Sequence, residues 1–320
     1  MIKPQRFWLI LLSLFLGVQI YIFFYKKSKT TQPMETSVAD LDLAANQIQQ
    51  KMMGGHLVEA QGGKRDWELF SKVSISYQGR SDWDLEGVEI RFYNSELQDM
   101  VVKGNKGNID MSTKDMRISG DVRIESSNGY VFFAPFIEYS AKNRLIFCNQ
   151  SVRVLGPMIS GKRNLQLNSI GIQIPINDRK MKLLKQVRGT QTTDQGQVIR
   201  VESDSAELSS VSQTASFDGR VSMQNGDQSL RSQSALFAFD EQTKKFSILD
   251  MKGNVELMQG PRKVLSDDLR IDFANEKLTF SGKPRLYQDE DELTGDKIIF
   301  LEGGKKVKVE KVKAKGISPP

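Results

Sequence analysis

The sequence predicts an all-β, antiparallel protein that is preceded by a single membrane-spanning helix. Three observations lead to this prediction. An uncharged run of residues lies near the N-terminus, apolar and polar residues alternate after residue 55, and a short phrase recurs along the chain. The phrase is a glycine, a spacer, an apolar residue, a second spacer and a second apolar residue.

The uncharged run, residues 7–25, reads FWLILLSLFLGVQIYIFFY. As a helix it would be about 28 Å long, close to the ~30 Å hydrocarbon core of a bilayer. A cleaved signal peptide would need a shorter apolar core and a small-residue cleavage site, and neither is present. We therefore expect an uncleaved anchor at 7–25 behind a tail at 1–6. Basic residues flank both sides, so their distribution does not decide the orientation.

A polar linker is expected at 26–54. Asp40 is placed to cap a short helix at 41–53, whose apolar residues share one face and which Gly54 would end. This helix would lie on the membrane or pack against the first domain, and a simple stalk is the alternative.

The recurring phrase begins at Gly120, Gly219, Gly253 and Gly282, and a further copy has Gln150 in place of the glycine. We expect the glycine to begin each structural unit. Between the copies lie hairpins in which an apolar pair, a polar turn and a second apolar pair follow one another. Such repetition indicates stacked units that bury a face against their neighbours. With no crossover helix between strands, the pattern excludes α/β folds and favours an antiparallel sandwich, jelly roll or stacked β architecture.

Apolar residues of both phrases are expected to point inward, because residues two apart share one face of a strand. They would form a packed core if the two sheets close, or line an apolar trough if the sheets splay at one edge, and both possibilities stay open. The residues are Val122, Ile124, Ile137, Tyr139, Phe147, Val152, Val154, Val221, Met223, Phe237, Phe239, Val255, Leu257, Ile271, Phe273 and Phe280.

Charge and residue usage exclude several classes of function. The net charge is +6, but the basic excess lies beside the anchor and after residue 304, and residues 30–304 carry 34 basic and 38 acidic side chains. A nucleic-acid partner is therefore not expected. The single cysteine, Cys148, and the single histidine, His56, exclude an internal disulfide and a zinc site built from clustered Cys and His. We find no catalytic set and expect no enzyme activity, no metal and no cofactor.

The C-terminal segment KKVKVEKVKAK, residues 305–315, is expected to be an edge strand available to a partner. Val307 and Val309 alternate there with Lys306 and Lys308. Lysines on an edge discourage uncontrolled sheet extension. The same row of lysines suits phosphorylated head groups or an acidic partner, and the two interpretations are compatible.

Two stretches carry a resemblance to a known family. GGHLVEAQGGKRDWELFSKVSIS and LEGVEIRFYNSELQDMVVKGNKGNIDMSTKDMRISGDVRI resemble the LptC type of lipopolysaccharide-export protein. GQVIRVESDSAELSSVSQTASFDGRVSMQ and LTGDKIIFLEGGKKVKVEKVKA resemble the repeats of LptA/OstA-type bridge proteins. The resemblance implies an elongated, OstA-like β-jellyroll of stacked rungs in one or two tandem segments. These segments would be LptC-like at 55–185 and LptA-like at 186–315, followed by a tail at 316–320.

The resemblance also implies a function. The chain would be a single-pass inner-membrane protein with a cytoplasmic tail and its bulk in the periplasm. Its apolar trough would bind the acyl chains of lipopolysaccharide, and its partners would be the subunits of the membrane ABC transporter and another β-jellyroll joined end to end. Residues 156–195 fit neither phrase and would join two jellyrolls or form an irregular strand. The alternative is an anchored structural β-solenoid that scaffolds the envelope without binding lipid.

Overall fold

A computed structural model describes the chain from residue 48 to residue 315. The predicted tail at 1–6, the membrane helix at 7–25 and the tail at 316–320 lie outside the described residues. Among the described residues, no helix is long and apolar enough to cross a membrane. The gaps within the described part are residues 95–96, 160, 177, 194–195, 241, 244–245, 305 and 312.

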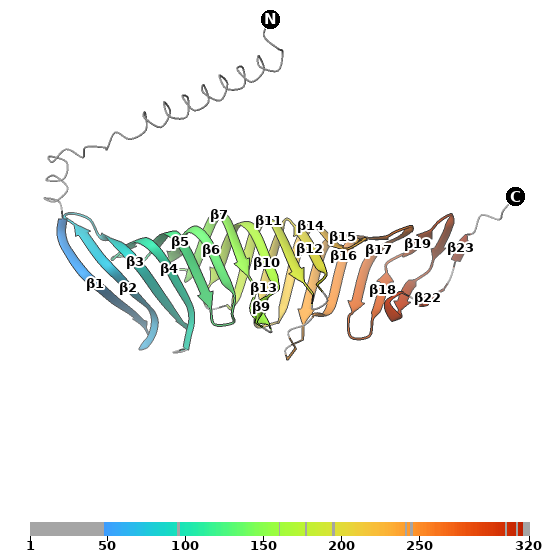
Figure 1. The fold of residues 1–320 in the computed structure, drawn as a ribbon, viewed down its shortest axis with the longest axis horizontal. Coiled ribbons are helices and arrows are strands. Elements are labelled where there is room, and N and C mark those ends of the chain that lie inside the picture. Colours follow the sequence, from blue (N-terminus) through green and yellow to red (C-terminus); the bar gives the residue numbers. More distant parts are fainter. Residues whose placement is uncertain are drawn as a thin grey trace, which may run out of the picture. The chain divides into compact units, whose positions relative to one another are not determined.

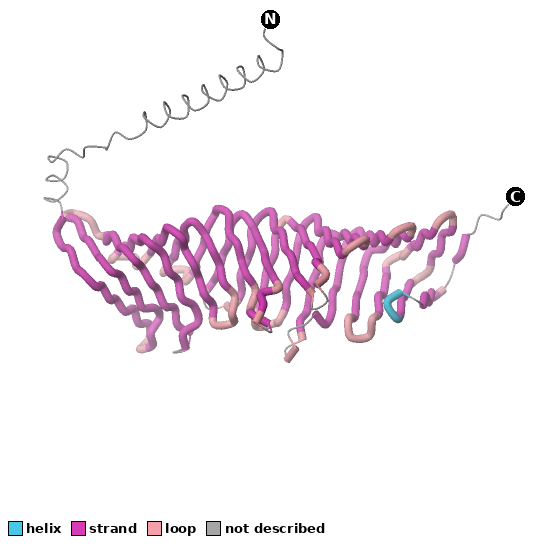
Figure 2. Tube along the Cα trace, in the orientation of Figure 1, coloured by secondary structure: helices cyan, strands magenta, loops and turns pink. Residues whose placement is uncertain are grey.

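The described residues form antiparallel strands almost throughout, as Figures 1 and 2 show, which confirms the all-β, antiparallel prediction. Nearly all of them belong to one compact unit, Gln50–Pro320. The elements are β1 (Ile48–Gln61), β2 (Lys64–Tyr77), β3 (Asp82–Asn94), β4 (Leu97–Asp110), β5 (Met116–Ser126), β6 (Val131–Ser140), β7 (Leu145–Leu155), β8 (Met158–Ile159), β9 (Lys162–Arg163), β10 (Leu165–Pro175), β11 (Lys180–Thr192), β12 (Val198–Ser203), β13 (Ser205–Ser209), β14 (Thr214–Asn225), β15 (Gln228–Phe239), β16 (Phe246–Gln259), β17 (Arg262–Asp272), β18 (Lys277–Ser281), β19 (Arg285–Gln288), β20 (Asp291–Thr294), β21 (Lys297–Leu301), a 3-10 helix at Glu302–Gly304, β22 (Lys306–Glu310) and β23 (Lys313–Lys315).

Most long strands pair with their neighbours in sequence, and a long strand that is split into two short ones pairs half by half, as β12 and β13 do with β11 and β14. In the described residues this gives one sheet of 21 strands from β1 to β22 and β23. The small β8–β9 hairpin forms its own two-stranded sheet between β7 and β10. β7 and β10 pair directly on either side of this hairpin. Pairing of neighbours gives a ladder that grows by about 4.8 Å for each strand.

Each long strand bends near its middle, which divides the sheet into two walls. In β14 and β15, residues 214–218 pair with 234–238 before an interruption in register, and 221–225 pair with 228–232 after it. β12 and β13 are the two halves of one such strand, and each pairs with its own half of β14. We call the half-strands continuous with 214–218 wall A and those continuous with 221–225 wall B.

The glycine of the recurring phrase lies at this bend. Gly120, Gly219, Gly253 and Gly282 have φ between 75° and 78°, and the residue after each has φ between 49° and 56°. Two successive left-handed residues form a bulge, which bends a strand and shifts its register. The expectation that the glycine begins a unit is therefore wrong: it marks a corner in mid-strand.

Behind each corner a valine and a small residue face each other across neighbouring strands. The pairs are Val122 with Ala134, Val152 with Ser169, Val187 with Ser203, Val221 with Ser232, and Val255 with Ser266. The four serines are buried, and each hydroxyl donates to the carbonyl two residues later in its own strand. The bulge interrupts the ladder here, so the hydroxyl supplies a donor where backbone pairing is incomplete.

The helix expected at 41–53 is contradicted by the described part of that segment. Residues 48–53 belong to β1, and the remainder lies outside the described residues. Gly55, within β1, packs so closely on β2 that a Cβ there would come within 2.5 Å of the hydroxyls of Ser71 and Ser74. Pairing with β2 overrides the helical preference of the Gln, Lys and Met side chains.

Residues 156–195, expected to join two jellyrolls or form an irregular strand, contain the short β8–β9 hairpin and two long strands, β10 and β11, that continue the ladder. The proposed boundary at 185/186 falls inside β11, and pairing continues across it from β10 to β14. The phrase was hidden here because Lys185 stands where the glycine would be. Gln186 still adopts φ 52°, and Val187 occupies the corner.

We expect Gly253→Ala to lower the free energy of unfolding by about 1–2 kcal/mol, because an L-residue is strained at φ 78°. The new Cβ would also lie 2.5 Å from Oε1 of Gln233. Gly260→Ala is the matched control, since Gly260 has φ +54° but nothing within 4 Å of its Cβ position. Urea unfolding should show the larger loss for Gly253→Ala, and equal losses would contradict a sterically tight corner.

Candidate functional site: the apolar interior between the walls

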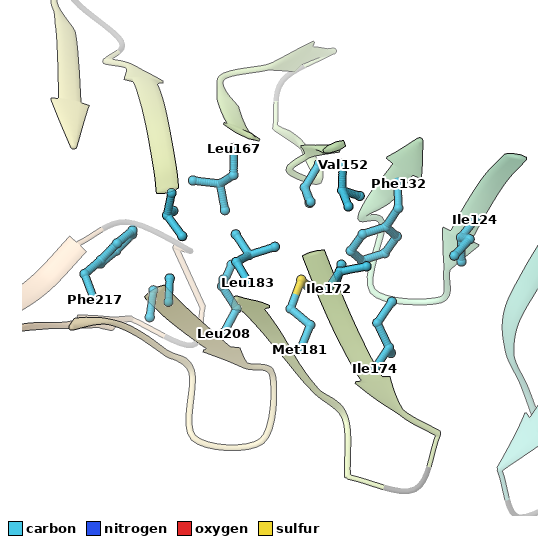
Figure 3. Packing of buried hydrophobic residues seen from close by; sticks show 14 of the residues in the cluster. Ile124, Phe132, Val152, Leu167, Ile172, Ile174, Met181, Leu183, Leu208 and Phe217 are labelled. Atoms are coloured by element: carbon cyan, nitrogen blue, oxygen red, sulfur yellow. The ribbon is translucent and has the colours of Figure 1, made fainter. Parts of the chain in front are cut away.

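Inward side chains of both walls form one continuous hydrophobic cluster. Figure 3 shows Phe132, Val152 and Leu167 facing Ile172, Met181 and Leu183 across the interior. Twelve of the residues expected inside are buried in it: Val122, Ile124, Ile137, Tyr139, Val152, Val154, Val221, Met223, Phe237, Val255, Leu257 and Phe280. Phe239 and Ile271 are partly buried and pack against it.

Two aromatic residues expected inside are not buried in the cluster. Phe147 is half-buried between the buried Ile146 and Cys148, so the alternation in β7 is displaced by one residue from the expected pattern. A one-residue shift exchanges the two faces of a strand. Phe273 is 39% exposed where β17 turns toward β18, and its ring contacts Phe246 at a centroid distance of 5.9 Å. Phe147 faces away from the interior, and that expectation was wrong. Phe273 lies at the exposed margin of the inner face, against Phe246, which packs on the cluster.

The ends of the sheet carry unpaired edges. Among the described residues, β22 pairs only with β21, β23 only with β20, and β1 only with β2. Val307 is 43% exposed beside the exposed Lys306 and Lys308, whereas Val309 packs against the hydrophobic cluster. The expected edge strand is present, and its partner stays a prediction.

The two walls make direct contact near the β1 end of the interior. Asp66 of β2, in wall B, forms an ion pair with Arg144, at the tip of wall A between β6 and β7. Their side chains are 10% and 19% exposed. The rings of Phe92 and Tyr139 also meet between the walls, with centroids 4.9 Å apart. These contacts hold the two free edges together at this end.

Polar groups near this contact lie in a partly dehydrated setting. Burial raises the pKa of Glu68, but hydrogen bonds from the Tyr93 hydroxyl (2.9 Å) and the Arg65 guanidinium (3.0 Å) outweigh it, so the pKa lies below its usual value. Burial, and then the charge of Asp66, raises the pKa of Tyr139. The Tyr139 hydroxyl is buried without a hydrogen-bond partner among the described residues.

Farther along the stack the walls separate and leave a cavity of about 620 Å³. Its lining includes Phe132 and Leu165 from wall B and Ile174, Met181 and Leu208 from wall A. A smaller hollow of about 50 Å³ shares Leu165 and Leu208 with it and is lined further by Phe217 and Phe237. Both of the expected forms of the interior therefore occur: it is a packed core along much of its length and is hollow near β10–β13.

The site offers apolar surface rather than reactive groups. Within the described ranges, no group of three His, Cys, Asp or Glu side chains is placed to hold a metal ion. Cys148 is a buried free thiol inside the cluster. The arrangement is suited to binding an apolar chain.

A bent antiparallel stack around an apolar interior defines an extended β-jellyroll protein. A family model described as lipopolysaccharide-assembly, LptC-related, matches residues 10–193. This is more than half of the chain, and the chain belongs to that family. A second model, LptA/(LptD N-terminal domain) LPS transport protein, matches residues 200–300. The resemblance seen in the sequence is confirmed in both halves, and the matches indicate a component of lipopolysaccharide transport.

One similar solved structure is that of LptH from Pseudomonas aeruginosa, the LptA-homologous periplasmic component of the lipopolysaccharide transport device. Its identity to this chain is 18%, with a TM-score of 0.34, and the match covers 38% of this chain and 95% of LptH. This similarity is too low to support an inference about the chain. None of the curated proteins compared with the chain matches it.

We expect Asp66→Asn to lower the free energy of unfolding by about 3 kcal/mol, because it leaves the largely buried Arg144 without its carboxylate. Chemical denaturation measures this loss. Asp204→Asn is the control, since the Asp204–Arg220 pair is exposed and should have no measurable effect. An equally small effect of Asp66→Asn would show that the contact between the walls contributes nothing to stability.

Proposed function

We propose that the chain is an inner-membrane-anchored, periplasmic component of the lipopolysaccharide export bridge, and that its interior shields lipid A acyl chains. The observation that carries this proposal is the continuous cluster of inward side chains, which extends from Trp67 in β2 to Phe300 in β21. The matches to LptC-related and LptA-type families support it.

The energetics favour a continuous apolar path. Each CH₂ group of an acyl chain that leaves water gains about 0.8 kcal/mol, so a lipid crossing an aqueous space needs apolar contact along its whole route. The stack supplies such contact on successive strands, each about 4.8 Å beyond the last.

Lipid entry requires the walls to move apart, and the pairing pattern permits this. Half-strands pair within their own wall, as 214–218 do with 234–238 and 221–225 do with 228–232. Separating the free edges therefore breaks side-chain packing without breaking the ladder hydrogen bonds. The corners, with their paired left-handed residues, act as the hinge.

The edges suggest how the chain joins its neighbours. Addition of a strand to an open sheet edge is a common mode of recognition. We place the ABC transporter subunits at the β1 edge, next to the anchor at 7–25, and another β-jellyroll at the β22–β23 edge. The residues after the anchor then lie in the periplasm.

A structural scaffold without lipid binding is the second candidate. The observation that favours it is the close packing of the interior, where residues such as Ile118, Leu183 and Met251 are fully buried by other side chains of the protein. In that case the walls would stay closed.

Photo-cross-linking in lipopolysaccharide-producing cells separates the two candidates. Photoreactive residues at Val122, Val255 and Leu257, which face the interior, should capture lipopolysaccharide because the acyl chains pass them. Arg123 and Glu256, on the outer face, are the matched controls and should capture much less. Equal yields on both faces, or none inside, would rule out the lipid trough.

The same experiment tests the edge. A photoreactive residue at Lys308, on β22, should capture a partner protein, whereas one at Lys252, exposed in mid-stack, should not. If Lys308 captures no protein, the end-to-end pairing is wrong.

A further inference from the structure

The outer face of wall B carries a row of mostly basic side chains across the LptC-like half. Each member pairs with the next on the neighbouring strand, and each directly follows a buried inward residue. At about 4.8 Å for each strand, the row spans roughly 24 Å along the direction of stacking. We call it the basic row, and its members are Lys103, Arg123, Phe133, Arg153, Asn168 and Arg188.

Phe133 lies at the centre of the basic row. Its side chain is half-buried but does not belong to the hydrophobic cluster of the interior. Arg123 on β5 and Arg153 on β7 flank it, and their guanidinium carbons lie 5.7 and 4.6 Å from the centroid of its ring. Stacking on the ring holds these two like charges close together. Less side-chain freedom is therefore lost when the two arginines bind an anionic partner.

The basic row holds more cations than the nearby carboxylates neutralise. Arg153 forms no ion pair with any described residue, so its charge is left without a carboxylate. The other three cations form exposed ion pairs, which are weak. These pairs are Lys103–Glu89, Arg123–Glu125 and Arg188–Glu202, and Glu89 is shared with Arg91.

Farther along the stack, the same line of paired residues is balanced in charge. Beyond Arg188 it continues as Glu202, Ser222, Arg231 and Glu256, where acids and a cation alternate. The positive excess along this line therefore belongs to the LptC-like half.

An anionic bilayer surface is complementary to this face. The residues of the basic row line neither the cavity near β10–β13 nor the smaller hollow, so they present their charge on an open sheet face. Ile170, which is 40% exposed and pairs with Lys185, adds an apolar side chain beside the row. Anionic phospholipids attract basic residues that lie close to a membrane. The anchor predicted at 7–25 would keep the folded unit close to such a surface.

We propose that the basic row docks on the anionic phospholipids of the membrane surface. The row runs along the direction of stacking, so docking lays the LptC-like half along the bilayer. The docked posture is therefore one that the chain adopts outside an assembled bridge. This inference goes beyond the proposed function, because it concerns the outer face and does not depend on what occupies the interior.

The test uses the full-length chain in liposomes of phosphatidylglycerol and phosphatidylcholine, with a photoreactive residue at Asn168. This residue is exposed between Arg153 and Arg188 of the basic row. It should cross-link phospholipid, and liposomes of phosphatidylcholine alone should give a yield at least fivefold lower. Gln173 of the same strand, on the outer face of wall A, is the matched control position and should also give a low yield. Equal yields at Asn168 and Gln173, or in the two kinds of liposome, would overturn the proposal.

Charge variants test the cause of docking, with thermal unfolding used to check that each variant folds. Arg123→Ala combined with Arg153→Ala should lower the Asn168 yield at least fivefold, because each cation near an anionic surface strengthens the attraction about fivefold. Arg123→Lys combined with Arg153→Lys keeps both charges and should keep the yield. Arg231→Ala combined with Arg285→Ala removes two exposed cations of wall B in the LptA-like half and should leave the yield unchanged. A loss with the lysine variant as large as that with the alanine variant would overturn the electrostatic attraction to the membrane.

Salt provides a check that needs no variant. Raising the salt concentration from about 0.1 M to 1 M shortens the Debye length from about 10 Å to 3 Å and should lower the Asn168 yield to that of Gln173. An unchanged yield would contradict docking through charge.

The same photoreactive residue at Asn168, used in cells, separates a membrane from a protein partner. The expected adduct is a phospholipid. A protein adduct without a phospholipid adduct would overturn the membrane surface as the partner of the basic row.

Discussion

The two-walled shape of the sheet follows from the corner in the middle of each long strand. A strand that ran straight would give a flat ladder with one buried face and nothing to cover it. Two left-handed residues in succession, as at Gly253 and Asn254, bend the strand and shift its register. The two halves then face each other, and each wall buries the apolar face of the other.

The chemistry of the corner explains why the phrase has its form. Glycine tolerates positive φ without steric cost, and the following residue carries a polar side chain to solvent. The valine after them points inward against a serine or alanine of the next strand, where only a small residue leaves room at the inside of a bend. The buried serine hydroxyls donate hydrogen bonds to carbonyl oxygens of their own strands and so satisfy acceptors at the corner.

The all-β architecture and most inward residues could be predicted from alternation and repetition. The position of the corners, the register of some strands and the distance between the walls could not. The phrase at Gly253 identified inward residues correctly, while the position of its glycine in mid-strand depends on pairing partners that one strand does not reveal. Ile48 and Met52 are four apart, which suits one face of a helix and one face of a strand equally. Phe147 was misplaced because the length of the preceding turn sets the register. The cavity near β10–β13 depends on the distance between the two walls, and no local sequence pattern encodes that distance.

A sheet hinged along its corners can open without losing the hydrogen bonds of its ladder. Spin labels can be placed at Asn128, on the free edge of wall B, and at Val211, on the free edge of wall A, since both residues are exposed. Pulsed electron–electron double resonance then measures the distance between the two free edges. Addition of lipopolysaccharide to the full-length chain should shift the distance between these labels to longer values by several ångströms. The distance between labels at Arg231 and Lys252, both outside the cavity, should stay unchanged. An unchanged Asn128–Val211 distance with saturating lipopolysaccharide would contradict the account.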